Sequence, residues 1–193
     1  MLAHQGENSV TRILALTVVL LCGCGGGGGE NSALTQGKAL LAEGKHEAAA
    51  VELKKAVKKD RNSMEGWMRL GDAYRALKKH DDALSAYVTA KRVDRHSVAP
   101  HLAHARVQIE LGRIPDAILE LTLVTEMDPK NLEALVTLGR ISQLPHKQTD
   151  GSTGVTKLDL ERAEMNLEAA AALAPDNAEV KKELAGLRAK LGK

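Results

Sequence analysis

The sequence predicts an all-α protein: an α-solenoid of about four stacked helical hairpins followed by a C-terminal capping helix. The first observation is a repeat, because Asp60, Asp94 and Asp128 are evenly spaced (94 − 60 = 128 − 94 = 34), and this period is typical of stacked helical pairs. The second is composition, since the chain has no Phe, one Trp and two Tyr. A core with so few aromatic side chains suits closely packed helices, whereas a β-sandwich or barrel needs strands rich in aromatic and β-branched residues.

The N-terminal segment carries the pattern of an export signal. An apolar run at residues 13–21 is too short to span a bilayer, which takes roughly 20 apolar residues, so it is typical of a secretory signal. The letters LCGC follow at residues 21–24 and resemble the bacterial lipobox, which implies cleavage before Cys24 and its lipidation. The alternatives are an ordinary signal peptide with incidental cysteines, or a metal or redox pair of Cys22 and Cys24.

A glycine tract follows Cys24. The run from Gly25 to Gly29 favours neither a core nor a helix, so we expect a flexible tether. A phosphate-binding loop would need a preceding strand and a closing Gly-Lys-Ser/Thr, and the sequence has neither here. The predicted organisation is a signal peptide, a lipidated tether and a repeat domain, at residues 1–23, 24–30 and 31–193.

Small residues recur once per helix within the repeat. They let the two backbones of a hairpin approach closely, while larger residues fill the space around the contact. The expected contact residues are Gly37, Ala49, Gly71, Ala83, Ala117, Gly139 and Ala163. The units they define span about residues 30–63, 64–97, 98–131 and 132–177, and the capping helix spans 178–191.

The second unit is the most regular. It reads W…LG…Y…A…F…A as Trp67, Leu70, Gly71, Tyr74, Ala83, Tyr87 and Ala90. This pattern resembles the tetratricopeptide repeat (TPR), with Tyr in place of Phe and Arg95 in place of the usual Pro. The resemblance covers about residues 30–191 and implies a right-handed solenoid of antiparallel helix pairs. In the third unit, His104 and Ala105 stand where Leu and Gly are usual.

The fourth unit contains an insertion. The separation of Ala117 and Ala163 (163 − 117 = 46) exceeds the repeat period of 34 by 46 − 34 = 12. The Pro, Gly, Ser and Thr content near residues 144–157 predicts a mobile surface loop. The loop is either a tolerated insertion or a contact element for a partner.

Several residues indicate helix ends. Gly44 and Gly112 suit the left-handed conformation that closes a first helix. Asp81 is expected to cap the second helix of its unit. Asn131 and Asn177 each follow a proline by two residues and precede a glutamate by two, so we expect them to be N-caps between units.

The TPR resemblance implies that the first helices line a groove for a peptide or a partner helix. The groove residues carried over are Lys38, Met68, Asp72, Arg75, Leu102, Arg106, Ile109, Arg140 and Gln143. Their four cations would form a basic column suited to a segment with carboxylates and apolar anchors. Alternatively, these cations belong to a solvated face and are paired with Asp72, Glu110 and Glu133.

Nothing in the sequence predicts catalysis or a cofactor. The 27 Lys and Arg nearly balance the 25 Asp and Glu, which gives no indication of nucleic-acid binding. His96, His101 and His104 lie close in sequence, but no carboxylate or cysteine completes a metal site there, so we expect them at the surface. The chain also lacks a Gly-x-Ser-x-Gly nucleophile motif.

Together these patterns resemble the TPR lipoproteins that serve envelope assemblies, such as pilus or secretin assembly and exopolysaccharide export. They predict a membrane-anchored scaffold that binds proteins or peptides of the bacterial cell envelope. The alternative is a regulatory or ligand-binding module of an envelope polysaccharide or peptidoglycan enzyme complex. Gly25, rather than Asp, follows the lipidated cysteine, which suggests an outer-membrane protein facing the periplasm.

Overall fold

The computed structural model describes residues 32–148 and 151–193. The chain divides into two units, Met1–Glu30 and Asn31–Lys193, and the described residues lie in the second. The predicted signal peptide, the lipidation site Cys24 and the glycine tether lie outside the described residues. Among the described helices, none combines the length and the hydropathy needed to cross a bilayer.

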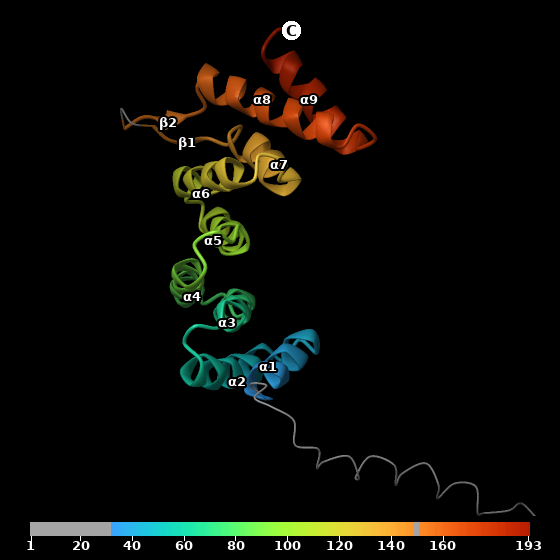
Figure 1. Cartoon of the computed structure of the whole chain (residues 1–193). Coiled ribbons are helices and arrows are strands. Elements are labelled where there is room, and N and C mark those ends of the chain that lie inside the picture. The colour runs from blue at the N-terminus through green and yellow to red at the C-terminus, as the bar shows by residue number, and fades with distance from the viewer. Residues whose placement is uncertain (1–31, 149–150) are drawn as a thin grey trace, which may run out of the picture. The chain divides into compact units, whose positions relative to one another are not determined.

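The second unit is a stack of helical hairpins in which each helix packs against the next along the chain (Figure 1). This arrangement confirms the predicted all-α solenoid. A short antiparallel ladder, β1 and β2, interrupts the helices between α7 and α8. The elements are α1 Ser32–Ala42, α2 His46–Lys59, α3 Met64–Ala76, α4 His80–Val93, α5 Ala99–Glu110, α6 Ile114–Met127, α7 Leu132–Ile141, β1 His146–Lys147, β2 Thr153–Gly154, α8 Lys157–Leu173 and α9 Ala178–Lys190.

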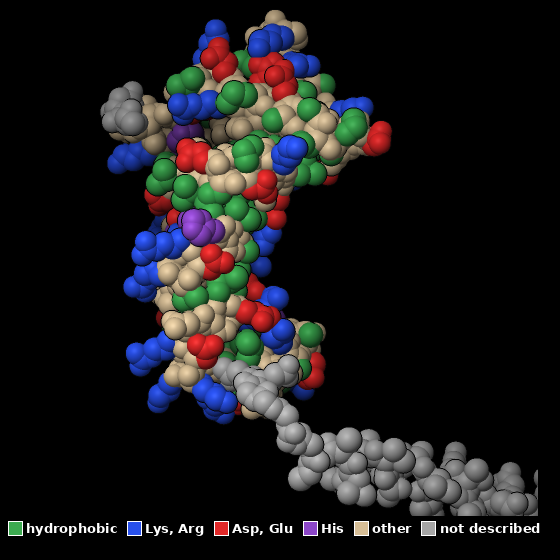
Figure 2. Space-filling view, viewed as in Figure 1, with side chains coloured by type: hydrophobic (Ala, Val, Ile, Leu, Met, Phe, Trp, Pro, Cys, Tyr) green, Lys and Arg blue, Asp and Glu red, His purple; other side chains and the backbone are tan. Residues whose placement is uncertain are grey.

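The first and second helices of the hairpins lie on different sides of this stack. In Figure 1, the first helices α1, α3, α5 and α7 lie towards one side, and α2, α4 and α6 lie towards the other. Figure 2 shows that the side of the first helices is hollowed. The stacking of hairpins therefore gives the unit a concave face made of first helices.

The hairpins close where small residues meet large ones. Gly71 lies against the ring of Tyr87, and any Cβ at this position would collide with that ring. A Cβ at Gly37 or Gly139 would likewise lie 2.5 Å from the Cγ of a buried leucine on the second helix. The regular spacing of small residues continues on the second helices, where four alanines are 0% exposed: Ala49, Ala83, Ala117 and Ala163.

The turns inside the hairpins use left-handed residues. Gly44 and Gly112 have φ values of 73° and 70°, as predicted for residues that end a first helix. Lys78 occupies the same turn in the second unit, with φ 59°, although a side chain disfavours this conformation. The prediction for Asp81 is wrong, because α4 begins at His80 and Asp81 lies within its first turn.

The N-caps between units are confirmed. The Asn131 side chain accepts a hydrogen bond from the N–H of Ala134 at the start of α7. The Asn177 side chain accepts from the N–H groups of Glu179 and Val180 at the start of α9. These caps satisfy backbone donors that a helix start leaves free, so they fix where each new unit begins.

The insertion in the fourth unit has more structure than the predicted loop. β1 and β2 pair antiparallel, with His146 opposite Gly154, and the following α8 begins with a capping box of Thr156 and Asp159. Gln148 Nε2 donates to Asp159 Oδ2 at 3.2 Å. Burial would raise the pKa of Asp159, but the hydrogen bonds from Thr156 outweigh it and the pKa is lowered. The prediction of a mobile loop missed this anchor onto α8.

Candidate functional site

The concave face carries the predicted column of cations, one on each of four first helices. Each cation forms an ion pair with a carboxylate on the next first helix, or on α9 at the end of the stack. The pairs are Lys38–Glu65 at 2.6 Å, Arg75–Glu110 at 2.9 Å, Arg106–Glu133 at 3.0 Å from Nε, and Arg140–Glu179 at 2.9 Å. We call this series of inter-unit pairs the groove ladder.

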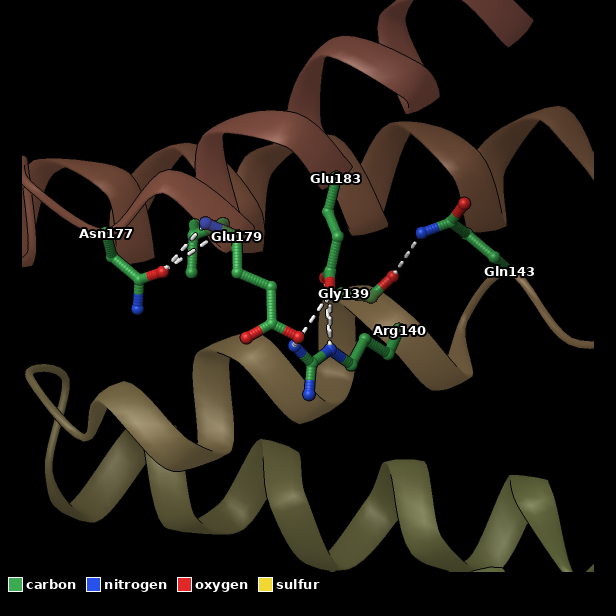
Figure 3. Close-up of polar contacts among 7 residues, drawn as sticks. Gly139, Arg140, Gln143, Asn177, Glu179 and Glu183 are labelled. Atoms are coloured by element: carbon green, nitrogen blue, oxygen red, sulfur yellow. Dashed lines mark hydrogen bonds and ion pairs between the residues drawn. The ribbon is translucent and has the colours of Figure 1, made fainter.

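The last step of the groove ladder is the most extensively bonded (Figure 3). Arg140 Nε donates to Glu183 Oε1 at 2.9 Å, while its Nη2 donates to Glu179. The Asn177 cap starts α9 two residues before Glu179, which places both glutamates above α7. Hydrogen bonding to Glu183 raises the pKa of Arg140, so this guanidinium is held as a cation.

A shallow pocket of about 420 Å³ lies beside this step. Gln143 lines it and is held at both ends of its amide. Its Nε2 donates to the carbonyl of Gly139 at 2.9 Å, and its Oε1 accepts from Lys190 Nζ at 3.0 Å. Leu144 and Leu187 supply apolar lining. The pocket therefore offers apolar surface next to fixed polar groups, the composition that ligand pockets generally have.

The groove ladder is displaced by about one helical turn in the second unit. Asp72 occupies the position that Lys38 holds one unit earlier (72 − 38 = 34). It pairs with Arg69 at 3.3 Å and accepts a hydrogen bond from the buried Tyr87 hydroxyl at 2.8 Å. The link to the third unit comes instead from Arg75, one turn further along α3. Asp72 thus ties together the two helices of its own hairpin.

Apolar side chains lie between the charged positions. Met68 packs against the core formed by α2 to α5, and Leu102 and Ile109 pack against the next core, formed by α5 to α7. All three remain partly exposed. The concave face therefore alternates apolar contacts with ion pairs along the stack.

Both sequence interpretations of the basic column have a part in this geometry. The cations lie on successive first helices, and the expected pairing with Glu110 and Glu133 is present, whereas Asp72 pairs with Arg69 instead. Their side chains nevertheless keep considerable exposure, 50% for Arg106 and 46% for Arg140. The pairs with Glu65 and Glu179 were not anticipated, although the spacing of Lys38 and Glu65 recurs for Arg106 and Glu133 (65 − 38 = 133 − 106 = 27).

A buried polar cluster lies inside the stack, at α4, α5 and α6. His101 and His104 are 8% and 9% exposed, so the prediction of surface histidines is wrong for both. Their Nδ1 atoms lie 2.7 and 3.2 Å from the Glu120 carboxylate, and Lys91 Nζ lies 2.6 Å from it. Burial would raise the pKa of Glu120, but hydrogen bonds from His104, Lys91 and His101 outweigh it and the pKa is strongly lowered.

The cluster does not provide a metal site. In residues 32–148 and 151–193, no group of three or more His, Cys, Asp or Glu side chains is arranged to hold a metal ion. The Lys91 ammonium already contacts Glu120, and its positive charge opposes cation binding there. The cluster is therefore an internal charge network at the seam between the second and third units.

Residues 34–94 match the family model of the tetratricopeptide repeat. The fold is a TPR solenoid. Solved structures with this fold include MamA from Desulfovibrio magneticus RS-1, with 17% identity, a TM-score of 0.69, and coverage of 85% of this chain and 87% of that chain. A thermophilic TPR protein from Thermus thermophilus is 20% identical, with a TM-score of 0.61 and coverage of 82% and 80%.

Two further TPR structures concern peptides. YrrB, described as a TPR protein with an unusual peptide-binding site, is 16% identical with a TM-score of 0.64, over 83% of this chain and 76% of that chain. The first TPR domain of Spaghetti, bound to an HSP90 peptide, is 24% identical with a TM-score of 0.55, over 58% and 89%. At these identities the likeness establishes the fold alone.

A curated relative also matches the TPR region. Superkiller complex protein 3 of Mus musculus is 28% identical over 138 residues, which is 72% of this chain. The chain spans only 9% of the length of that protein. TPR folds are scaffolds for protein and peptide binding.

Proposed function

We propose that this chain is a membrane-anchored TPR scaffold that binds a partner protein along its first helices. The observation that carries the proposal is the groove ladder itself, with apolar side chains between its charged pairs. An extended or helical segment that carries carboxylates and apolar anchors complements this surface. Each arginine of the ladder has five N–H donors, and its bonds to the neighbouring glutamates leave donors for a partner.

Arg106 shows which hydrogen-bond donors of a ladder arginine are already used. Its Nε and Nη2 both bond to Glu133, and its side chain is 50% exposed. Among the residues that the structure describes, none forms a hydrogen bond with the remaining guanidinium nitrogen, Nη1, which can donate to a carboxylate of the partner. Because the pair is solvated, its contribution to stability is small, about 0–1 kcal/mol, and a partner that competes for Arg106 loses little of it.

The same proposal places the protein in the bacterial cell envelope. The support is the signal-like N-terminus and the resemblance of residues 21–24 to a lipobox. Two or three acyl chains on Cys24 would hold the domain at the membrane, because each buried CH₂ contributes about 0.8 kcal/mol. Gly25 after the cysteine favours the outer membrane, with the TPR domain facing the periplasm.

The anchor is tested by cell fractionation and mass spectrometry of the native protein. We expect the mature chain to begin at an acylated Cys24 and to fractionate with the outer membrane. The Cys24→Ser variant should appear in the soluble periplasmic fraction. An unmodified cysteine in the mature chain, or a Cys24→Ser variant that stays with the membrane, would refute the anchor.

The groove is tested by crosslinking of the native protein and by quantifying the partner that is recovered. The double variant Arg75→Ala/Arg106→Ala should recover at least tenfold less partner at unchanged melting temperature. The control is Lys58→Ala/Lys59→Ala, which removes two exposed cations from the end of the second helix α2. If the groove variant recovers as much partner as the control, the concave face is not the binding surface.

A second candidate function is a module that regulates an envelope polysaccharide or peptidoglycan enzyme. In this module the insertion, rather than the groove, binds the partner. The observation that favours it is the anchoring of the β1–β2 ladder onto α8 through Gln148 and Asp159. Replacing residues 146–154 by a short Gly-Ser linker separates the candidates. A groove-based scaffold keeps its partner, whereas an insertion-based module loses it.

A further inference from the structure

A shallow cleft of about 530 Å³ lies between the second helices α4 and α6, away from the groove ladder. Its walls include Val88 from α4 and Leu123 from α6, each 39% exposed. Met127 adds apolar surface, and His101 from α5 contributes to the lining. Its lining thus combines apolar side chains with polar groups, as ligand pockets generally do.

The cleft borders the position at which the second unit carries its Trp. His101 follows Trp67 by one repeat period (101 − 67 = 34) and occupies the same position in its unit. Trp67 packs against the core of α2 to α5, and its Nε1 donates to the carbonyl of Arg61 at 2.9 Å. The imidazole of His101 is smaller than an indole, and its Nδ1 is bound to Glu120 at 2.7 Å. No indole therefore fills the seam of the third unit.

The residue that receives the Trp67 hydrogen bond also has a counterpart at the edge of the cleft. Arg61, whose carbonyl receives the indole N–H, precedes Arg95 by the same period (95 − 61 = 34), and Arg95 lines the cleft. The cleft in the third unit thus corresponds to the region that the Trp67 side chain occupies in the second unit. An aromatic side chain from another protein could lie there as the indole of Trp67 lies in the second unit.

The cleft is also positively charged. Arg92 and Arg95 line it and are both exposed. Across the described part of the chain, neither forms an ion pair, and Arg92 bonds only to the Thr89 hydroxyl at 3.3 Å. Lys91, also in the lining, is neutralised by Glu120. Figure 2 shows Lys and Arg side chains along the flank of the molecule where α4 lies.

We propose that the cleft between α4 and α6 is a second docking site, which takes an aromatic side chain of a partner segment flanked by carboxylates. The aromatic ring packs on Val88, Leu123 and Met127 in the place where the second unit has Trp67. The flanking carboxylates pair with Arg92 and Arg95, whose forked donors suit a bidentate contact. This site is separate from the groove proposed above and does not depend on it.

The direct probe is the acetylated and amidated pentapeptide Glu-Glu-Trp-Glu-Glu. Binding is followed by NMR of ¹³C-methyl groups in the full chain, where Val88, Leu123 and Met127 report on the cleft. We expect these three methyl signals to shift in a saturable way. Two control peptides separate the contributions: Gln-Gln-Trp-Gln-Gln removes the charge and Glu-Glu-Ala-Glu-Glu removes the ring, and each should bind at least tenfold more weakly.

Two variants test the site from the protein side. His101→Trp supplies the missing indole, and Arg92→Glu/Arg95→Glu reverses the charge; each should weaken the peptide at least tenfold. The matched control is Lys58→Glu/Arg61→Glu, the same change one repeat earlier, which should alter affinity less than twofold. The groove variant Arg75→Ala/Arg106→Ala should also leave peptide affinity unchanged. A negative result at the cleft therefore does not count against the groove, and the two proposals are tested separately.

Three outcomes would overturn the proposal. One is the absence of shifts at the three cleft methyl groups. Another is equal loss of affinity in the two charge-reversed variants, which would mean unspecific attraction to a basic surface. The third is a folded His101→Trp variant with unchanged affinity. If that variant fails to fold, Leu123→Glu replaces it, because Leu123 is partly exposed and the same tenfold weakening is expected.

Discussion

The Tyr87 hydroxyl donates a 2.8 Å hydrogen bond to Asp72 Oδ1, and the ring of the same tyrosine fills the space that a side chain at Gly71 would need. One buried residue on α4 thus contacts two neighbouring positions on α3. Burial first, and then the charge of Asp72, raise the pKa of Tyr87, so the phenol remains a donor. The hairpin closes because the glycine admits the ring and the aspartate receives its hydroxyl.

Gly71→Ala should therefore destabilise the fold by about 1–3 kcal/mol, the usual cost of overpacking a core. The matched control is Gly186→Ala on α9, where an added Cβ meets nothing within 4 Å. That change should stabilise the protein by about 0.5–1 kcal/mol, because alanine favours a helix over glycine. Urea unfolding measures both, and effects of equal sign would contradict the packing argument.

Gly44, Lys78 and Gly112 occupy the same turn in three successive units, and Lys78 is the one that is not glycine. Its left-handed conformation is unfavourable for a residue with a Cβ, by about 1–2 kcal/mol. Lys78→Gly should raise the free energy of unfolding by up to about 1 kcal/mol, because glycine adopts this conformation without that penalty, and Gly112→Lys should lower it. Thermal unfolding followed by circular dichroism checks the pair; a destabilised Lys78→Gly variant would show that the lysine side chain makes a compensating contact.

Arg106 and Glu133 are both about half exposed, so their pair should contribute little to stability. A double-mutant cycle of Arg106→Ala and Glu133→Ala should give a coupling energy of about 0.2–1 kcal/mol. The coupling should fall further at high salt, because salt screens exposed charges. A coupling well above this range would assign the groove ladder to stability rather than to recognition.

The Glu120 cluster makes stability depend on pH. The pKa of Glu120 is lowered in the folded state from its ordinary value of 4.5, so ionised Glu120 stabilises the fold fully above pH 4.5. That contribution is lost as the pH falls from 4.5 towards the lowered pKa. Glu120→Gln should reduce stability at pH 7 by about 1–3 kcal/mol, through the loss of charged hydrogen bonds.

Urea unfolding between pH 7 and pH 3 tests this linkage. Below the ordinary pKa of 4.5, the stability of the Glu120→Gln variant should fall less steeply than that of the wild type. Glu126→Gln, an exposed change on the same helix, serves as the control and should retain the wild-type slope. Identical slopes for all three proteins would exclude Glu120 as the source of the pH dependence of stability.

Much of the fold follows from the repeat period. That period places Gly71, Ala83 and Tyr87 at the hairpin contact, and the Asn-x-Glu pattern identifies Asn131 and Asn177 as caps. These signals are local or strictly periodic, which is why sequence reasoning recovers them. The short β1–β2 ladder is different, because such short strands carry no pattern and depend on Gln148 and Asp159 meeting in space.

The site was less accessible to sequence reasoning. The groove cations could be aligned on the first helices, but their partners lie on other helices, and the change of register at Asp72 has no periodic signal. The burial of His101 could have been recognised, because it takes the position of Trp67 one period later. Its pairing with Glu120 could not, since that contact depends on how α5 and α6 pack.

The most direct test of the scaffold is site-specific photo-crosslinking in the intact cell envelope. A photoreactive residue at Ala99, exposed at the start of the first helix α5, is compared with one at Val51, 53% exposed on the second helix α2. If the first helices hold the partner, Ala99 forms a discrete crosslinked product that Arg75→Ala/Arg106→Ala abolishes, and Val51 does not. Equal products from both positions, or an Ala99 product that survives the groove substitutions, would contradict the account.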